Sequence, residues 1–233
     1  MLKNTEIKLN IGCGYLNTPE DWINIDNSFS ARIAKHPLVK KFLYKIKILP
    51  KRLYELPWPD NIMVCDLRKR LPFENGTVKY IYTSHLLEHL TRNEAMFLLK
   101  ECYRVLGNEG VIRIIVPDIQ AATENYIGRM KQIKAESIYS DVIPADEFLD
   151  GLGVFDDTGG ADPLWIRFAR ILQGNKNIHK WMYDYYSLSL KLKQCGFTKI
   201  VQKKYLDSQI EAVNRLDNPD RFKGCLCVEA NKE

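Results

Sequence analysis

The stretch KLNIGCGYLNTPEDWINIDN, residues 8–27, contains an apolar strand, a Gly12-Cys13-Gly14 turn and a second short apolar strand that ends at Asp26. Glycine at positions 12 and 14 lets the backbone turn sharply and approach a ligand with no Cβ in the way. A carboxylate at the end of the neighbouring strand can accept both hydrogen bonds of a ribose diol. This stretch therefore predicts a site for an adenosine-type ligand.

Beyond this stretch, short apolar runs alternate with helical ones, which is typical of an α/β fold whose mostly parallel sheet has helices on both faces. Strands are expected at 7–11, 22–25, 62–65, 80–83, 111–116, 199–203 and 225–229, and helices at 94–106 and 187–195. We expect a single domain over 1–233 with insertions at about 29–61 and 119–186. The second insertion contains a polar, glycine-rich loop at 150–162, so we expect the insertions to form a lid that binds substrate.

The net charge of +5 is unevenly distributed, because the segment from Arg32 to Arg52 has eight basic residues and no acidic one. Its apolar residues recur at helical spacing, which predicts one basic amphipathic helix that ends before Pro50. Either this helix packs over the core by one face, or it contacts anionic lipid or phosphate. With no membrane span and no signal-peptide pattern at 1–6, we expect a cytoplasmic protein, and the basic helix adds peripheral contact with the inner membrane surface as an option.

Four motifs follow one another in order: LNIGCG at 9–14, INID at 23–26, CDLRKRLPFENGTVKYIYTSHLLEHL at 65–90 and ECYRVLGNEGVIRIIVPD at 101–118. In these motifs the chain resembles the class I S-adenosylmethionine-dependent methyltransferases. The resemblance implies a Rossmann-like sheet of seven strands whose last two form an antiparallel hairpin. It also implies S-adenosyl-L-methionine as the cofactor.

The resemblance places the cofactor-binding residues at Asn10, Gly12, Cys13, Gly14, Asp26, Asp66, Leu67 and Ser84. The glycine turn would pass under the methionine moiety, Asp26 would bind the ribose hydroxyls, and Asp66 would read the adenine amino group. Asn10 stands where the family usually has an acid, and Leu16 stands where it has a third glycine. The short interval between Gly14 and Asp26 predicts a turn instead of a full crossover helix.

Two histidines are candidate general bases for transfer to a hydroxyl: His85, which follows the fourth strand, and His179. Candidate acceptor contacts are Asp118, Trp181 and Tyr183. The HLLEH turn at 85–89 and the HKWMYD segment at 179–184 resemble small bacterial methyltransferases of surface-glycan biosynthesis. We therefore expect O-methylation of a sugar, glycan intermediate or similar polar metabolite, and no nucleic-acid acceptor.

Several alternatives remain open. The acceptor could instead be a small natural product, or the chain could be a cofactor-binding module without turnover. An NAD-dependent oxidoreductase also uses a glycine turn and an acid, although the GxGxxG pattern is incomplete here. His85, Glu88 and His89 fit the HxxEH pattern of metal hydrolases, but this pentapeptide follows a buried strand, so no metal site is expected.

Overall fold

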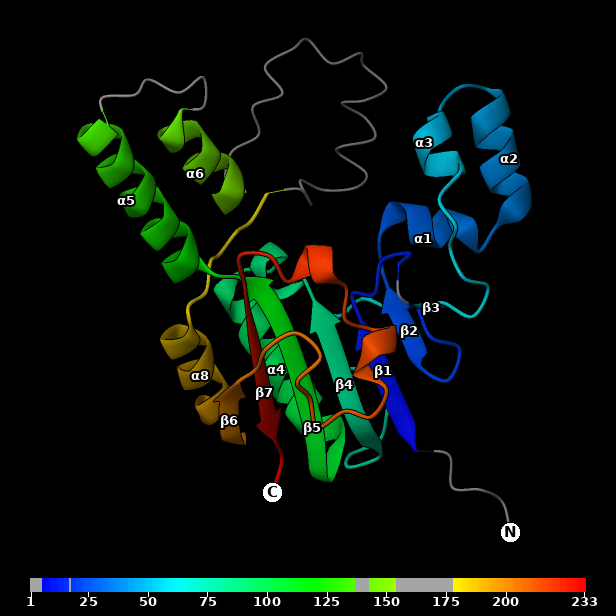
Figure 1. Ribbon diagram of the computed structural model, residues 1–233. Coiled ribbons are helices and arrows are strands. Elements are labelled where there is room, and N and C mark those ends of the chain that lie inside the picture. Colours follow the sequence, from blue (N-terminus) through cyan, green and yellow to red (C-terminus); the bar gives the residue numbers. More distant parts are fainter. Residues whose placement is uncertain (1–5, 17, 137–142, 154–177) are drawn as a thin grey trace.

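The computed structural model describes residues 6–16, 18–136, 143–153 and 178–233. In this part of the chain seven strands form one sheet in the order β3-β2-β1-β4-β5-β7-β6 (Figure 1). The strands are β1 (Ile7–Ile11), β2 (Ile23–Asp26), β3 (Met63–Val64), β4 (Val78–Ser84), β5 (Leu106–Pro117), β6 (Thr198–Gln202) and β7 (Cys225–Asn231). β1 to β5 pair in parallel, whereas β7 is antiparallel to both β5 and β6. The predicted fold class is confirmed.

One face of the sheet is covered by α4 (Arg92–Val105) and α8 (Tyr185–Gln194). α4 begins at a capping box, in which Thr91 and Glu94 each bond the other's backbone amide, and such a box satisfies two of the amides that a helix start leaves unpaired. Its buried residues recur every three or four positions, so they form one apolar stripe against the strands. Both helices begin two residues before the predicted starts at 94 and 187.

The other face is covered by the segment 204–224, which contains the short 3-10 helices η2 (Val213–Arg215) and η3 (Pro219–Arg221). Tyr80 and Tyr82 of β4 pack on this side together with Leu216, while the intervening Ile81 belongs to the opposite core. Between β1 and β2 the described residues form only turns, as the short interval predicts. The segment 204–224 thus covers the sheet face opposite α4 and α8.

The first insertion differs from the prediction of one helix. It forms α1 (Phe29–Ala34), α2 (Pro37–Lys45) and α3 (Lys51–Tyr54). Pro37 is the reason for the break, because proline lacks an amide hydrogen, disfavours helix in the residue before it and is well suited to a first helical position. None of the α2 residues is buried, so α2 does not pack on the core.

The second insertion contains α5 (Ile119–Glu136) and α6 (Pro144–Leu152). Figure 1 shows α5 and α6 beyond the carboxyl edge of the sheet on one side, and α1 to α3 beyond it on the other. Of the predicted loop at 150–162, residues 154–162 lie outside the described part. No helix among the described residues has the length and apolar character needed to span a bilayer.

Candidate active site

The glycine turn follows β1 and is held against β2 by its backbone. The amides of Gly12 and Cys13 both donate to the Ile25 carbonyl, at 2.8 and 3.1 Å. Gly12 has a φ of +65°, and a Cβ there would lie 3.0 Å from side-chain atoms of Leu86. Gly14 has a φ of +61° with open space around it. The sequence uses glycine here because other residues rarely adopt this backbone conformation.

Asp26 ends β2 and bonds the turn directly. Its Oδ2 accepts from the Gly14 amide at 3.1 Å, and its Oδ1 accepts from the Ser28 amide at 2.6 Å. Each carboxylate oxygen has a second lone pair, so Asp26 remains able to accept hydrogen bonds from a ribose diol. The carboxylate therefore connects the turn with the position predicted for the ribose.

Asp66 follows β3 and is paired with Arg68, whose Nε and Nη2 donate to the two carboxylate oxygens at 2.8 and 2.9 Å. These hydrogen bonds from Arg68 lower the pKa of Asp66 to about 2. The side chain of the adjacent Leu67 is 6% exposed and packs into the core. Asp66 is thus an anion held at the carboxyl edge, while Leu67 contributes packing.

A small hollow that is partly open to solvent lies at the glycine turn. It brings together four predicted residues, Asn10, Gly12, Cys13 and Ser84, and adds Leu16, Tyr82, Leu216 and Arg221. Ser84 Oγ is buried and has no hydrogen-bond partner among the described residues. A Cβ-free cradle and an unsatisfied buried hydroxyl fit the binding of a polar cofactor.

Asn10 and Cys13 have different surroundings at this hollow. Asn10 is 2% exposed and donates from Nδ2 to Asn24 Oδ1 at 2.9 Å. Burial, followed by the negative charge of Asp26, raises the pKa of the Cys13 thiol to about 12. Cys13 is therefore a neutral thiol that lines the site, and Asn10 brings an amide without charge.

Leu216 and Arg221 were missed in the sequence because they lie in the segment 204–224, far along the chain from the last motif, which ends at Asp118. Arg221 reaches the end of β4, where its Nη2 donates to the Ser84 carbonyl at 2.8 Å. The antiparallel β7 brings this segment back beside β5. No local motif marks this contact.

His85 follows β4 with a left-handed φ of +55°, and both of its ring nitrogens have neighbours. Nδ1 lies 3.1 Å from Glu88 Oε1, and Nε2 lies 3.0 Å from the Arg221 carbonyl oxygen. Although burial disfavours the charged ring, the contact with the Cys225 thiol and the nearby Glu88 carboxylate raise the pKa of His85 to about 10. A general base needs an accessible lone pair, so this geometry argues against His85 in that role.

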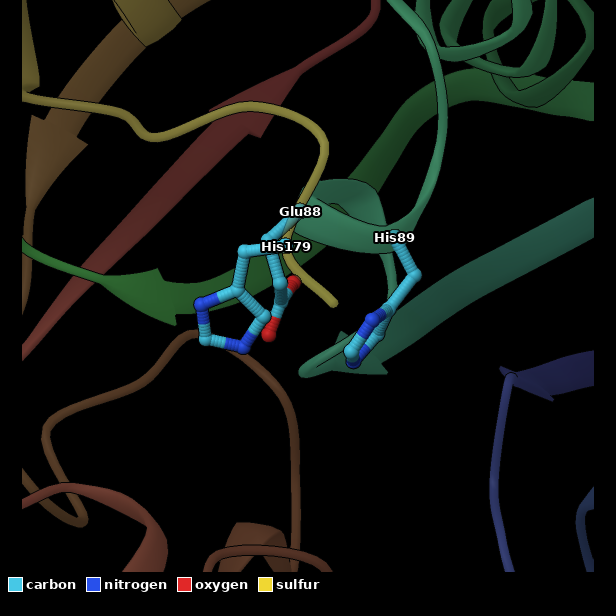
Figure 2. A group of neighbouring side chains, drawn as sticks. All are labelled: Glu88, His89 and His179. Atoms are coloured by element: carbon cyan, nitrogen blue, oxygen red, sulfur yellow. The ribbon is translucent and has the colours of Figure 1, made fainter. Parts of the chain in front are cut away.

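The HxxEH segment does not form the helical turn that a metal hydrolase requires. The 3-10 helix η1 covers only Leu87–His89, and His85 precedes it in a left-handed conformation. Instead, Glu88 and His89 lie beside His179, and their candidate ligand atoms are within 4.8 Å of one another (Figure 2). We call Glu88, His89 and His179 the histidine–glutamate group.

The predicted acceptor contacts do not form one surface. Tyr183 is 0% exposed and belongs to the hydrophobic core, which corrects its predicted role in acceptor stacking. The ring of Trp181 lies under the Arg92 guanidinium, 4.0 Å from the ring centroid. Asp118 pairs with Tyr183 through a backbone bridge, and its Oδ1 accepts from the Gln120 amide at 2.9 Å. Asp118 therefore caps the start of α5.

Residues 9–114 match the family described as "Methyltransferase domain", and no curated protein matches the chain. Among solved structures, a Pyrococcus horikoshii OT3 protein is 17% identical with a TM-score of 0.49, covering 97% of this chain and 81% of that one. A SAM-dependent methyltransferase from Archaeoglobus fulgidus is 15% identical with a TM-score of 0.44, covering 97% and 86%. Another from Methanosarcina mazei is 14% identical with a TM-score of 0.46, covering 99% and 94%.

The matched span begins at β1 and ends within β5, so it contains the glycine turn, Asp26, Asp66 and Ser84. These are positions at which the sequence predicts contacts with the cofactor. Over residues 9–114 the chain is thus similar to a methyltransferase domain, and this match supports methyl transfer from S-adenosylmethionine as the chemistry of the protein.

Proposed function

We propose that the protein O-methylates a sugar, a glycan intermediate or a similar polar metabolite. The observation that supports this proposal is the histidine–glutamate group, in which Glu88 and His89 come shortly after the strand that carries Ser84 and His179 comes from the segment before α8. A thiolate or an amine is a good nucleophile without a catalytic base, whereas a hydroxyl benefits from a general base that accepts its proton. Histidines at the carboxyl edge of the sheet therefore favour an alcohol acceptor.

When bound, S-adenosylmethionine supplies a methyl group on a positively charged sulfur. An acceptor hydroxyl that takes this methyl group would have to give up its proton to a base of the protein. In a metal-free reaction the base is His179: its Nδ1 lies 2.7 Å from the Leu152 carbonyl oxygen, so Nδ1 carries the hydrogen and Nε2 has the lone pair. The protein's main contribution is alignment of the acceptor with the methyl group.

The test is a radiolabelled methyl-transfer assay against fractionated nucleotide sugars, glycans, lipid-linked intermediates and small-molecule extracts. We expect label in a sugar-bearing fraction, and we expect His179→Ala to slow transfer by about 10² to 10⁴. His36→Ala is the matched control, because His36 is exposed at the start of α2. Label found only in small non-sugar extracts would favour a natural-product acceptor, and equal rates in both variants would exclude His179 as the base.

We also propose that the α2 surface contacts an anionic lipid bilayer, on which the acceptor is carried. We define this surface as Leu38, Val39, Phe42 and Ile46 together with Lys41 and Lys45. Leu38 is 83% and Phe42 60% exposed, and the two lie four residues apart on one face of α2. The flanking lysines complement anionic headgroups, and an exposed apolar face with basic flanks suits the interface of a membrane.

Vesicle co-sedimentation tests this contact. We expect binding to phosphatidylglycerol-containing vesicles and weaker binding to pure phosphatidylcholine, with loss of binding in Lys41→Glu/Lys45→Glu and in Leu38→Ser/Phe42→Ser. Lys131→Glu/Lys134→Glu makes the same charge change at exposed positions of α5 and should bind like the wild type. Equal loss in the α5 variant would show that only total charge matters, and would contradict a specific α2 surface.

A further inference from the structure

Two segments far apart in the sequence are fastened together at the histidine–glutamate group. The amides of Lys180 and Trp181 donate to the Glu88 carbonyl at 2.7 and 3.3 Å, and the rings of His89 and His179 are 5.0 Å apart between centroids. Figure 2 shows the three side chains converging from η1 and from the segment before α8. The backbone contacts thus keep the side chains in one place.

Glu88 is a buried carboxylate with too few partners. Its side chain is 0% exposed, and within the described ranges neither oxygen accepts an aligned hydrogen bond. His85 Nδ1 lies at ion-pair distance from Oε1, which leaves Oε2 without compensation. Because a buried charge is costly unless it is paired or binds a metal, Oε2 is suited to a further cationic partner.

Both histidines of the group have one ring nitrogen on a backbone carbonyl. His179 uses Nδ1 for the Leu152 carbonyl. The ring of His89 hydrogen-bonds the Ile178 carbonyl; its buried Nδ1 has no partner in the described chain, so Nε2 makes this bond. A carbonyl accepts only from an N–H, so in the neutral rings the opposite nitrogens hold the lone pairs. Metal-binding histidines are oriented by outer contacts of this kind.

We propose that Glu88, His89 and His179 bind a divalent transition-metal cation, for which Zn²⁺ is the appropriate probe. Two imidazole nitrogens and one carboxylate oxygen form a ligand set typical of catalytic zinc sites, and imidazole disfavours Mg²⁺ and Ca²⁺. The candidate ligand atoms lie within 4.8 Å of one another. Side-chain rotation would bring them to the ~2.0–2.2 Å that zinc requires.

Three protein ligands leave a fourth zinc position for water or an oxygen of another molecule. A cation bound here would coordinate the Nε2 lone pair of His179. His179 would then be a metal ligand and would not act as the general base proposed for the metal-free reaction. The catalytic consequence of the site rests on the proposed function, whereas cation binding itself does not. Binding and methyl transfer are therefore measured separately.

The test uses untagged protein, with metal content measured by elemental analysis and Zn²⁺ binding measured by calorimetry. We expect about one Zn²⁺ per wild-type chain and a melting temperature that rises with Zn²⁺ concentration. His89→Ala and His179→Ala should weaken binding by more than about a hundredfold, the upper end of what outer contacts alone contribute. Glu88→Gln retains the side-chain volume and should also weaken binding.

His36→Ala is the control, because it removes an exposed histidine remote from the site in the sequence. Melting temperatures without metal show whether each variant is folded, and the visible spectrum of the Co²⁺-loaded protein gives a second readout of the ligand set. The proposal is wrong if the folded wild type binds no Zn²⁺, or if His36→Ala loses as much affinity as His179→Ala. Methyl transfer in the presence of a chelator is assayed independently, so failure of the metal site does not imply failure of the proposed function.

Discussion

Gly12 and Gly14 both have left-handed backbone angles, but only Gly12 lies against another side chain. Gly14→Ala should cost the ~1–2 kcal/mol of a left-handed non-glycine residue. Gly12→Ala adds contact with Leu86 at 3.0 Å, so we expect a further ~1–3 kcal/mol from overpacking. Urea unfolding of the two variants gives the comparison, and equal losses would show that Leu86 moves aside without cost.

Asp66 gives a pH-dependent prediction. Its pKa is lowered to about 2 by hydrogen bonds from Arg68, against about 3.9 in an unfolded chain. A lowered acid pKa contributes stability that is complete above the unfolded value and is lost as pH falls through the folded one. The free energy of unfolding of the wild type should therefore exceed that of Asp66→Asn near pH 6, by about 1 kcal/mol or less because solvent screens the pair. This difference should decrease as the pH falls from 4 to 2. Unfolding measured over this series would contradict the ion pair if the difference stayed constant.

The glycine turn and the placement of Asp26 beside it could be predicted from single residues because their geometry is local. Gly12, Gly14 and Asp26 are joined by turn and strand ends that lie close in sequence. The cluster of Glu88 with His179 could not be predicted, because it depends on how a distant segment returns to the sheet. The HxxEH pattern pairs His85 with His89, whereas in the structure His85 has a left-handed backbone and lies beside Glu88 and the Arg221 carbonyl.

Among the elements, buried strands and capped helices were predictable, since their apolar periodicity and caps are written in the sequence. The basic segment was not, because Pro37 divides a continuous helical pattern into α1 and α2. β5 contains a similar exception in Arg113, a charged residue within an otherwise apolar run. Its side chain is 0% exposed, with Nη2 2.7 Å from Asp217 and Nη1 2.8 Å from Glu229.

The ion pairs of Arg113 with Asp217 and Glu229 connect β5 and β7 to the segment 204–224. We call these three residues the ion group, and we expect its loss to destabilise the packing of the whole segment on the sheet. Asp217→Ala leaves Arg113 with an unpaired part of its charge, and breaking a buried pair costs about 3–5 kcal/mol. Asp207→Ala, an exposed acid of the same segment that pairs with Lys203, should change stability by about 0.5 kcal/mol or less. Denaturant unfolding compares the two, and similar effects would mean that the ion group does not anchor the segment.

The helices of both insertions, α1 to α3 and α5 to α6, lie beyond the carboxyl edge of one sheet, and the histidine–glutamate group lies near that edge. In open α/β sheets this edge is where ligands bind. β1 to β5 are parallel neighbours in the sheet, whereas the covering of the second face by 204–224 depends on the antiparallel return of β7. The hollow at the glycine turn is therefore lined by residues from both ends of the chain, including Asn10 and Arg221.

The lining of this hollow by both ends makes cofactor binding a property of the complete fold. S-adenosylmethionine at about 100 times its dissociation constant should add ~2.7 kcal/mol to the free energy of unfolding, or about 5 to 10 °C in melting temperature. The demethylated product should stabilise the protein as well, whereas NAD should not. Asp26→Asn keeps the size of the side chain but removes its charge and one acceptor oxygen. The rise in melting temperature on adding S-adenosylmethionine should therefore be smaller in this variant. The melting temperature of the variant without ligand should change by less than this loss. A shift with NAD, or an undiminished shift in Asp26→Asn, would contradict the assignment of Asp26 to the ribose of this cofactor.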